Sequence, residues 1–206
     1  MEEQFAFAPV SAPKMRRPEF GAGFWLRAVA RIIDMAVHWG TSLAAGAAFT
    51  IAAAIFLAVM ESPSTQFFNE MQVVTAWDYA FALFGAIVYH TLAEGLHGAT
   101  LGKRILRLHV LKENGDPASI GQAFVRSLAF LIDGLFFGAI AAGSMQSSEL
   151  NQRVGDKWAK TVVVQRKELS GHPWPSDWRF LFVFLLAVCA DGIVSLMGVV
   201  IKMMLM

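Results

Sequence analysis

Arginine and aspartate recur at one spacing near the ends of two apolar segments of the sequence. Arg27 precedes Asp34 by seven residues, and Arg126 precedes Asp133 by seven residues. The surrounding sequences, F-W-L-R-A-V-A-R-I-I-D-M and A-F-V-R-S-L-A-F-L-I-D-G, are similar over about a dozen residues. Residues seven apart share one face of an α-helix. We therefore interpret the Arg-x6-Asp spacing as a repeated device, because charges beside a membrane are costly unless they have a partner or a function.

These charges suit two different roles. Intramembrane carboxylates that exchange protons or sodium need nearby positive charge, so the set is a candidate ion or proton relay. Alternatively, the charges form pairs that fix helix packing at the membrane interface, where a charge costs less than at the midplane. The candidates for transport or charge relay are Arg27, Asp34, Arg126, Asp133, Asp156 and Asp191. The secondary candidates are Arg31, His38 and Glu94.

Three further side chains have the spacing of metal ligands. His90, Glu94 and His97 fall on one helix face, and a carboxylate with two imidazoles suits zinc or another transition metal. No cysteine accompanies them, and a fourth ligand would have to come from His38. We therefore expect an interfacial hydrogen-bonding cluster here and no metal site.

The stretch G-A-T-L-G-K-R at 98–104 superficially resembles a phosphate-binding loop. It has three residues between its glycines where that loop has four, and Arg104 stands where serine or threonine is needed. The five histidines are scattered, and no nucleophile–base pair recurs. We expect no enzyme activity and no cofactor.

The composition indicates a membrane protein. Of 206 residues, 56% are hydrophobic and 16% are charged, with a mean hydropathy of +0.51, whereas about 25% of the residues of soluble domains are charged. The single cysteine, Cys189, lies in an apolar run and excludes a disulfide framework. The net charge of +1 gives no reason to expect a nucleic-acid partner. The predicted fold class is an all-α polytopic membrane protein.

Four apolar segments are candidates to enter the membrane: 24–60, 76–93, 123–145 and 180–204. Basic residues cluster in the 1–22 tail and the 95–122 connection, so the positive-inside rule places both in the cytoplasm. We expect a disordered tail (1–22), a membrane domain (23–167), and a linker with a C-terminal transmembrane helix (168–206). In that helix Asp191 should face protein, and Lys202 should extend towards the interface.

The topology of the third segment remains open. Basic residues flank it on both sides, so a simple crossing would place one basic flank outside the cell. A re-entrant or interfacial hairpin, bent near Asp133-Gly134 or Gly138, would keep both flanks inside. The sequence thus predicts three to four membrane segments.

A small cytoplasmic β element is expected between these segments. Residues 104–111 alternate apolar and polar side chains, as in a half-buried strand, and a turn signal follows at 113–117. The β-branched run 161–164 is a second strand candidate, and we expect the two to pair.

Four stretches together resemble the RDD family of integral membrane proteins: G-F-W-L-R-A-V-A-R-I-I-D (23–34), G-A-T-L-G-K-R-I-L-R-L-H-V (98–110), V-R-S-L-A-F-L-I-D (125–133) and R-V-G-D-K-W-A-K-T-V-V-V (153–164). The resemblance covers about residues 20–166. It implies that Arg27 and Asp34 are the arginine and first aspartate of the family name, with Asp156 or, alternatively, Asp133 as the second. Lys160 departs from the glycine usual in the last motif, and the segment after Asp133 lacks the frequent proline.

The resemblance implies transport of ions or small solutes. The alternative is a non-enzymatic accessory or structural subunit that docks on a larger membrane complex through the small-residue ridge of 40–52, the final span and the cytoplasmic loops. We expect a homo-oligomer or a larger membrane complex, and anionic lipid headgroups at the basic loops. The expected location is the bacterial cytoplasmic (inner) membrane, with the N-terminus in the cytoplasm.

Overall fold

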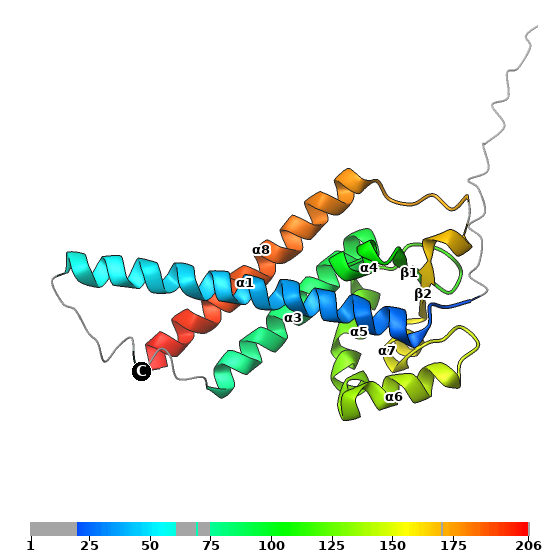
Figure 1. Ribbon diagram of the computed structural model, residues 1–206, viewed down its shortest axis with the longest axis horizontal. Helices are drawn as coiled ribbons and strands as arrows, with labels where there is room; N and C mark the ends of the chain where they lie inside the picture. The colour runs from blue at the N-terminus through cyan, green and yellow to red at the C-terminus, as the bar shows by residue number, and fades with distance from the viewer. Residues whose placement is uncertain (1–19, 61–68, 70–74, 170, 206) are drawn as a thin grey trace, which may run out of the picture.

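Three long helices extend from a group of short helices and strands, which we call the compact end (Figure 1). In this computed structural model, which describes residues 20–60, 69, 75–169 and 171–205, they are α1 (Phe24–Val59), α3 (Ala76–His97) and α8 (Asp177–Leu205). All three are long and apolar enough to cross a membrane, and one bent helix pair brings the number of candidate segments to at most four. The predicted all-α polytopic class is therefore confirmed. Residues 1–19 of the predicted tail lie outside the described part.

Helix α1 is one continuous helix of 36 residues, roughly 54 Å long at 1.5 Å per residue. The charged segment at its start therefore extends the apolar segment without a bend. Its buried residues, Ala30, Asp34 and His38, are spaced four apart and form one narrow stripe. None of the residues in its most apolar window is buried within the chain, as expected for a surface that faces lipid.

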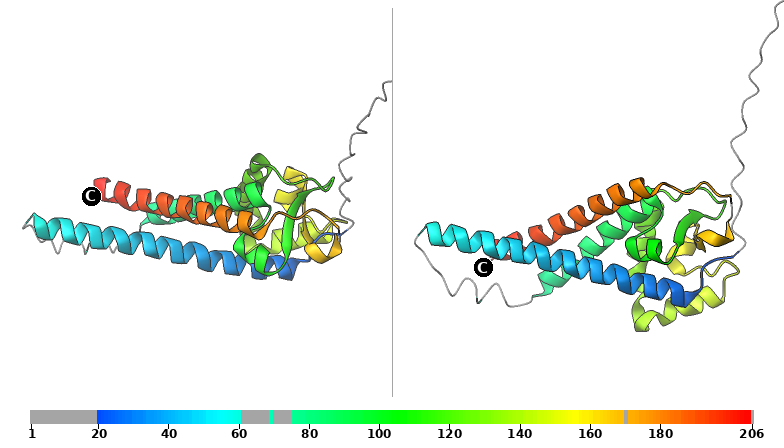
Figure 2. Two further views of the ribbon diagram at one scale, coloured as in Figure 1. Left: turned by 90° about the horizontal axis from the view of Figure 1, so that it is seen from above. Right: turned by 45° about the horizontal axis from the view of Figure 1, so that its top comes forward.

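Helices α1 and α8 both run away from the compact end. Helix α3 runs in the opposite direction, back towards the compact end (Figures 1 and 2). A capping box of Thr75 and Asp78 begins α3, and Gly98 ends it with a left-handed φ of 85°. Lys202 of α8 lies 3.1 Å from Asp78 and is 7% exposed. Asp78 thus provides a partner for Lys202 at this end of the helices, and the extension of Lys202 towards the interface stays a prediction.

The third apolar segment is bent. Helix α5 (Ile120–Asp133) ends at the predicted position, and α6 (Leu135–Gln146) follows after Gly134. The two helices meet at an angle of 111°, and Gly138 has a left-handed φ of 86°, a conformation that glycine adopts without a Cβ penalty. Of the two forms that the sequence left open, the chain adopts the bent one, and α6 stays at the compact end (Figure 1).

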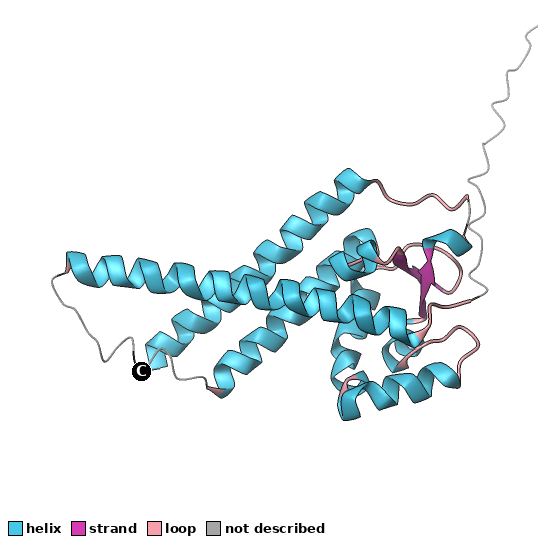
Figure 3. Cartoon of the chain, in the orientation of Figure 1, coloured by secondary structure: helices cyan, strands magenta, loops and turns pink. Residues whose placement is uncertain are grey.

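A two-stranded antiparallel sheet lies only at the compact end of the described chain (Figure 3). Strand β1 (Leu108–Lys112) pairs with β2 (Thr161–Gln165), with Val110 opposite Val163. The predicted pairing is confirmed, but two details were wrong. Residues 104 and 105 belong to the short helix α4 (Leu101–Ile105), and four residues of each strand are buried, so neither strand is half-buried.

Two short elements complete the compact end. Helix α7 (Val154–Ala159) precedes β2, just as α4 precedes β1, and the 3-10 helix η1 (Arg166–Glu168) follows β2. The side chains of Leu108, Val110 and Val163 form an apolar core with Ala22 and Ala30 at the start of α1. This core anchors the charged start of α1 to the sheet.

Candidate functional site

Nine charged side chains gather at the compact end, and we name this group the charge layer. Its members are Arg27, Arg31, Asp34, Glu94, Lys103, Arg126, Asp133, Arg153 and Asp156. They come from α1, α3, α4, α5, α7 and the N-cap of α7. The layer therefore joins segments that are distant in the sequence.

Asp156 is the residue on which both repeated arginines converge. Arg27 and Arg126 each form an ion pair with its carboxylate, and Arg153 Nε lies 3.4 Å from it. Asp156 and Arg126 are both fully buried. Burial alone would raise the pKa of the Asp156 carboxyl, but the three arginines outweigh burial and hold that pKa below its usual range.

Glu94 is a second centre of the charge layer. Its Oε1 accepts a hydrogen bond from Lys103 Nζ at 2.6 Å, and its Oε2 accepts one from Arg126 Nε at 2.9 Å. His90 Nδ1 lies 3.7 Å from Glu94 Oε1. Burial lowers the pKa of Lys103, and Glu94 partly counteracts this shift. Arg126 bridges the two centres because it binds both Glu94 and Asp156.

The two repeated aspartates each hold the start of a short helix. Asp34 accepts hydrogen bonds from the Thr100 hydroxyl at 2.6 Å and the Gly102 N–H at 2.8 Å, at the start of α4. Asp133 accepts hydrogen bonds from the N–H groups of Val154 at 3.1 Å and Gly155 at 3.4 Å, at the start of α7. A carboxylate in this position satisfies otherwise unpaired N–H groups and complements the positive end of the helix.

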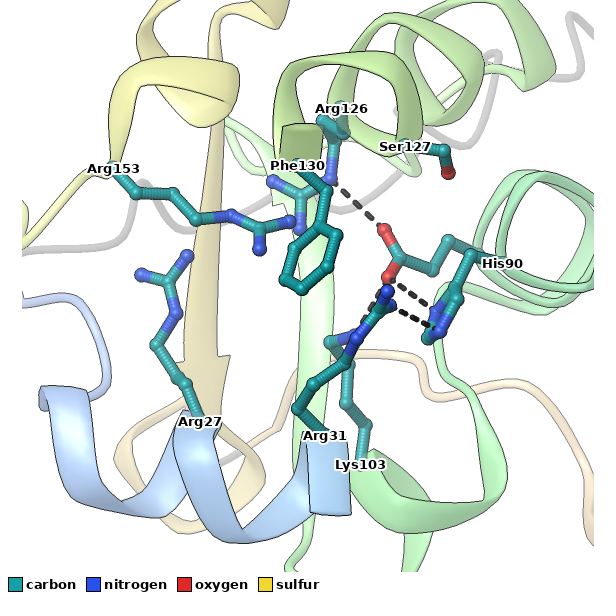
Figure 4. Close-up of a pocket in the computed structure, with 9 residues that line it drawn as sticks. Arg27, Arg31, His90, Lys103, Arg126, Ser127, Phe130 and Arg153 are labelled. Carbon is teal, nitrogen blue, oxygen red and sulfur yellow. Dashed lines mark hydrogen bonds and ion pairs between the residues drawn. The ribbon is translucent and has the colours of Figure 1, made fainter. Parts of the chain in front are cut away.

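A small cavity lies inside the charge layer. Its volume is about 30 Å³. Its lining residues are Arg27, Arg31, His90, Glu94, Lys103, Arg126, Ser127, Phe130 and Arg153. Figure 4 shows arginine side chains from several elements approaching one another around the Phe130 ring. The Arg31 guanidinium lies 3.6 Å from the centre of that ring, and Arg31 also contacts His90. The lining is dominated by cationic side chains.

A separate polar pair lies farther along the long helices. His38 Nδ1 is 3.0 Å from both carboxylate oxygens of Asp191, which is fully buried as predicted. Gly85 of α3 packs against Asp191, and a Cβ at this position would clash with its carboxylate. One turn farther along α1 and α8, the Ser42 and Ser195 hydroxyls lie 3.2 Å apart. The structure thus places Asp191 and His38 away from the charge layer.

Of the three spaced ligand candidates, the structure brings His90 and Glu94 together but not His97. No group of three or more His, Cys, Asp or Glu side chains suited to a metal ion occurs in the described residues. Glu94 belongs to the charge layer, and His90 lies beside it. His97 instead packs its ring against His109 at 5.7 Å and Phe180 at 5.1 Å.

Sequence reasoning missed several members of the site. It treated Lys103 and Arg153 as loop charges and gave no role to Gly102 and Gly155. A signal was present in the shared pattern of a glycine followed by a charge in G-K (102–103) and G-D (155–156), each just before a strand. Reading these two pairs as part of the Arg-x6-Asp repeat would have brought Lys103 into the site.

The part of the chain that holds the charge layer matches a known protein family. A family model described as the RDD family matches residues 21–160. The chain is 28% identical over 123 residues to "Uncharacterized protein YxaI" of Bacillus subtilis (strain 168), covering 56% of this chain and 80% of that protein. No solved structure matches significantly. The family match contains every member of the charge layer and ends before α8.

Proposed function

Because the chain belongs to the RDD family of membrane proteins, as the match over residues 21–160 shows, we propose that it transports an ion across the membrane. The observation that carries this proposal is the His38–Asp191 pair, buried among the three long helices. A buried carboxylate within a membrane segment is costly, and such acids commonly belong to ion paths or proton relays. Protons are the ions best suited to a histidine–aspartate pair.

Further polar pairs support a path along the helices. Starting at the charge layer, the Tyr89 hydroxyl donates to Asp34 at 3.3 Å. The His38–Asp191 and Ser42–Ser195 pairs follow, each one helical turn farther along, and the Lys202–Asp78 pair lies at the far end. Tyr89 and Asp78, at the two ends of this series, are 11 residues apart in α3, so the series extends roughly 17 Å at 1.5 Å per residue, a little over half of a hydrocarbon core of about 30 Å.

A groove supplies access from the far end. It has a volume of about 550 Å³ and lies between α1 and α3, and both His38 and Asp78 line it. Its other lining residues include Trp39, Leu43 and Ala47, so the two titratable side chains lie in a mainly apolar wall. In this proposal the charge layer forms the opposite mouth and faces the cytoplasm of a bacterial cell, since the basic residues of α4 and of the α7–η1 region lie there.

A flux assay on reconstituted protein tests the proposal. Proteoliposomes containing a pH-sensitive dye should acidify under a potassium–valinomycin potential when they contain the native chain. Asp191→Asn should reduce this flux at least about tenfold, because the amide cannot exchange a proton. The matched control is Asp177→Asn, since Asp177 belongs to the same helix and its side chain is 85% exposed. Flux equal to empty liposomes, or unchanged in Asp191→Asn, would refute the proposal.

A specific feature favours the second candidate, an accessory subunit of a larger complex. The small residues Gly40, Ala44, Ala48 and Ala52 of α1 are all exposed, so the other described helices leave this ridge open. Such ridges let helices approach closely in membranes. Stoichiometric co-purification with another membrane protein, combined with no flux by the isolated chain, would favour this candidate over transport.

A further inference from the structure

We propose that the charge layer binds a small monovalent anion of halide size, such as chloride, in its internal cavity. The proposal goes beyond ion transport and does not depend on it, because it concerns a resident ion that completes a buried cluster. Three observations carry it: the charge count of the layer, two unpartnered arginine nitrogens, and the size and lining of the cavity.

The charge layer has one positive charge in excess. Its cations are Arg27, Arg31, Lys103, Arg126 and Arg153, and its carboxylates are Asp34, Glu94, Asp133 and Asp156. Five cations against four carboxylates leave one charge unbalanced when His90 is neutral. Arg27, Arg31 and Arg153 are partly buried, and the other six members are buried. An unbalanced charge among such groups is costly, so a bound anion would stabilise the layer.

Two arginine nitrogens have unused hydrogen-bonding capacity. Nη2 of Arg126 and Nε of Arg31 are buried and have no hydrogen-bond partner among the described residues. Both side chains line the cavity, and Arg126 is fully buried. A guanidinium nitrogen can only donate, so its missing partner must be an acceptor.

The cavity suits a small acceptor without protons of its own. The one carboxylate in its lining, Glu94, already accepts from Lys103 and Arg126. The remaining polar lining consists mainly of donors, which favours an anion over a cation. A volume of about 30 Å³ exceeds the roughly 10–15 Å³ that one water needs. It is too small for a lipid headgroup. The single excess positive charge matches one monovalent ion, so the geometry points to a halide.

The test compares salts at constant ionic strength, which removes the general effect of screening. Full-length protein in detergent is melted in sodium gluconate while chloride or bromide replaces gluconate. We expect a rise in Tm that grows with the logarithm of the halide concentration and reaches about 3–5 °C at ten times Kd. Sulfate, which carries two negative charges, should cause no comparable rise. Equal Tm values in chloride and gluconate would overturn the proposal and would indicate that water fills the cavity or that Lys103 is neutral.

A matched pair of variants locates the effect. Arg31→Gln removes a donor and a charge from the cavity and should abolish the halide-dependent rise. Arg104→Gln removes the same charge from an ion pair with the exposed Asp177, outside the cavity, and should retain the rise. An unchanged halide response in Arg31→Gln would place the anion elsewhere and overturn the proposal. If that variant does not fold, line broadening of chloride-35 NMR by native protein, displaced by bromide, decides instead, and its absence would overturn the proposal.

Discussion

The two halves of the compact end use one structural device. In the first half, Asp34 of α1 binds the Gly102 N–H of α4, and β1 follows. In the second half, Asp133 of α5 binds the Gly155 N–H of α7, and β2 follows. Each glycine approaches the helix one turn before the aspartate, where Ala30 and Ala129 stand. The repeat therefore extends from the Arg-x6-Asp helix to the next short helix and strand.

The halves differ at the residue that follows the shared glycine. The first half has a cation there, Lys103, which binds Glu94. The second half has an anion, Asp156, which binds Arg27 from the first half and Arg126 from its own. A strictly identical repeat would place equal charges at these two buried positions. The difference makes the halves complementary, so that their association is stabilised by charge as well as by the paired strands.

The largest effect should come from removing the arginine that joins both centres. Arg126→Met leaves Glu94 and Asp156 each without one buried partner, so the free energy of unfolding should fall by about 3–5 kcal/mol. Arg27→Met removes the equivalent arginine of the first half. It should cost only about 1–2 kcal/mol, because Asp156 keeps Arg126 and Arg153. Unfolding in mixed SDS–detergent micelles, followed by circular dichroism, measures both.

Arg104→Met is the control for this prediction. It removes an arginine whose partner, Asp177, has a side chain that is 85% exposed, and should change stability by less than about 1 kcal/mol. Equal losses for Arg27→Met and Arg126→Met would show that the two halves contribute equally, contrary to the asymmetry described above.

A smaller effect is expected from adding a methyl group at Gly102 or Gly155, the two glycines that pack closely against a neighbouring helix. In Gly102→Ala the new Cβ would clash with the Ala30 carbonyl oxygen, and in Gly155→Ala it would lie 2.8 Å from Ala129 Cβ. We expect losses of about 2–3 kcal/mol and about 1–2 kcal/mol, because backbone moves less easily than a methyl group. Gly121→Ala is the control: its Cβ meets nothing within 4 Å and should be neutral or stabilising. The same unfolding assay would contradict this idea if Gly155→Ala were neutral.

The long elements could be predicted from the sequence because apolar runs of about 20 residues leave few alternatives. The bend of the third segment was predictable from its basic flanks and its glycines at 134 and 138. The start of β1 was misplaced. Arg104 and Arg107 are three apart, a spacing that suits a helical turn and conflicts with an alternating strand. In the structure, α4 ends at Ile105 and β1 begins at Leu108. The backbone turns between them at Arg107, which has a left-handed φ of 56°.

The sequence predicted which residues belong to the candidate site better than it predicted which of them bind one another. The spacing of Arg27 and Asp34 correctly indicated a shared helix face, but a shared face does not determine partners. Arg27 binds Asp156, 129 residues away, and Asp34 binds the α4 backbone. Such contacts depend on how α4 and α7 pack against the long helices, which hydropathy and periodicity do not encode. Lys103 and Arg153 were missed for that reason.

The strands offer the last and smallest test of the difference between the halves. His109 of β1 faces Val164 of β2 and is 3% exposed. Burial, with a contribution from His97, lowers the His109 pKa from 6.5 to about 3. Below pH 6.5 the unfolded chain therefore binds a proton that the folded chain does not, and stability falls as the pH falls towards 3. Between pH 7 and 5 the loss from this residue should be about 1–2 kcal/mol.

His109→Phe should remove that part of the pH dependence while keeping a ring against Trp174, which lies 5.0 Å from the imidazole. His172→Phe is the matched control, because His172 also contacts Trp174 but is only partly buried. Its pH dependence should stay close to that of the native chain. Unfolding curves at pH 5, 6 and 7 measure the slope. If the free energy of unfolding of His109→Phe changed with pH as steeply as that of the native chain, His109 would not contribute to the pH dependence. The difference between the two halves would then be confined to the charge layer.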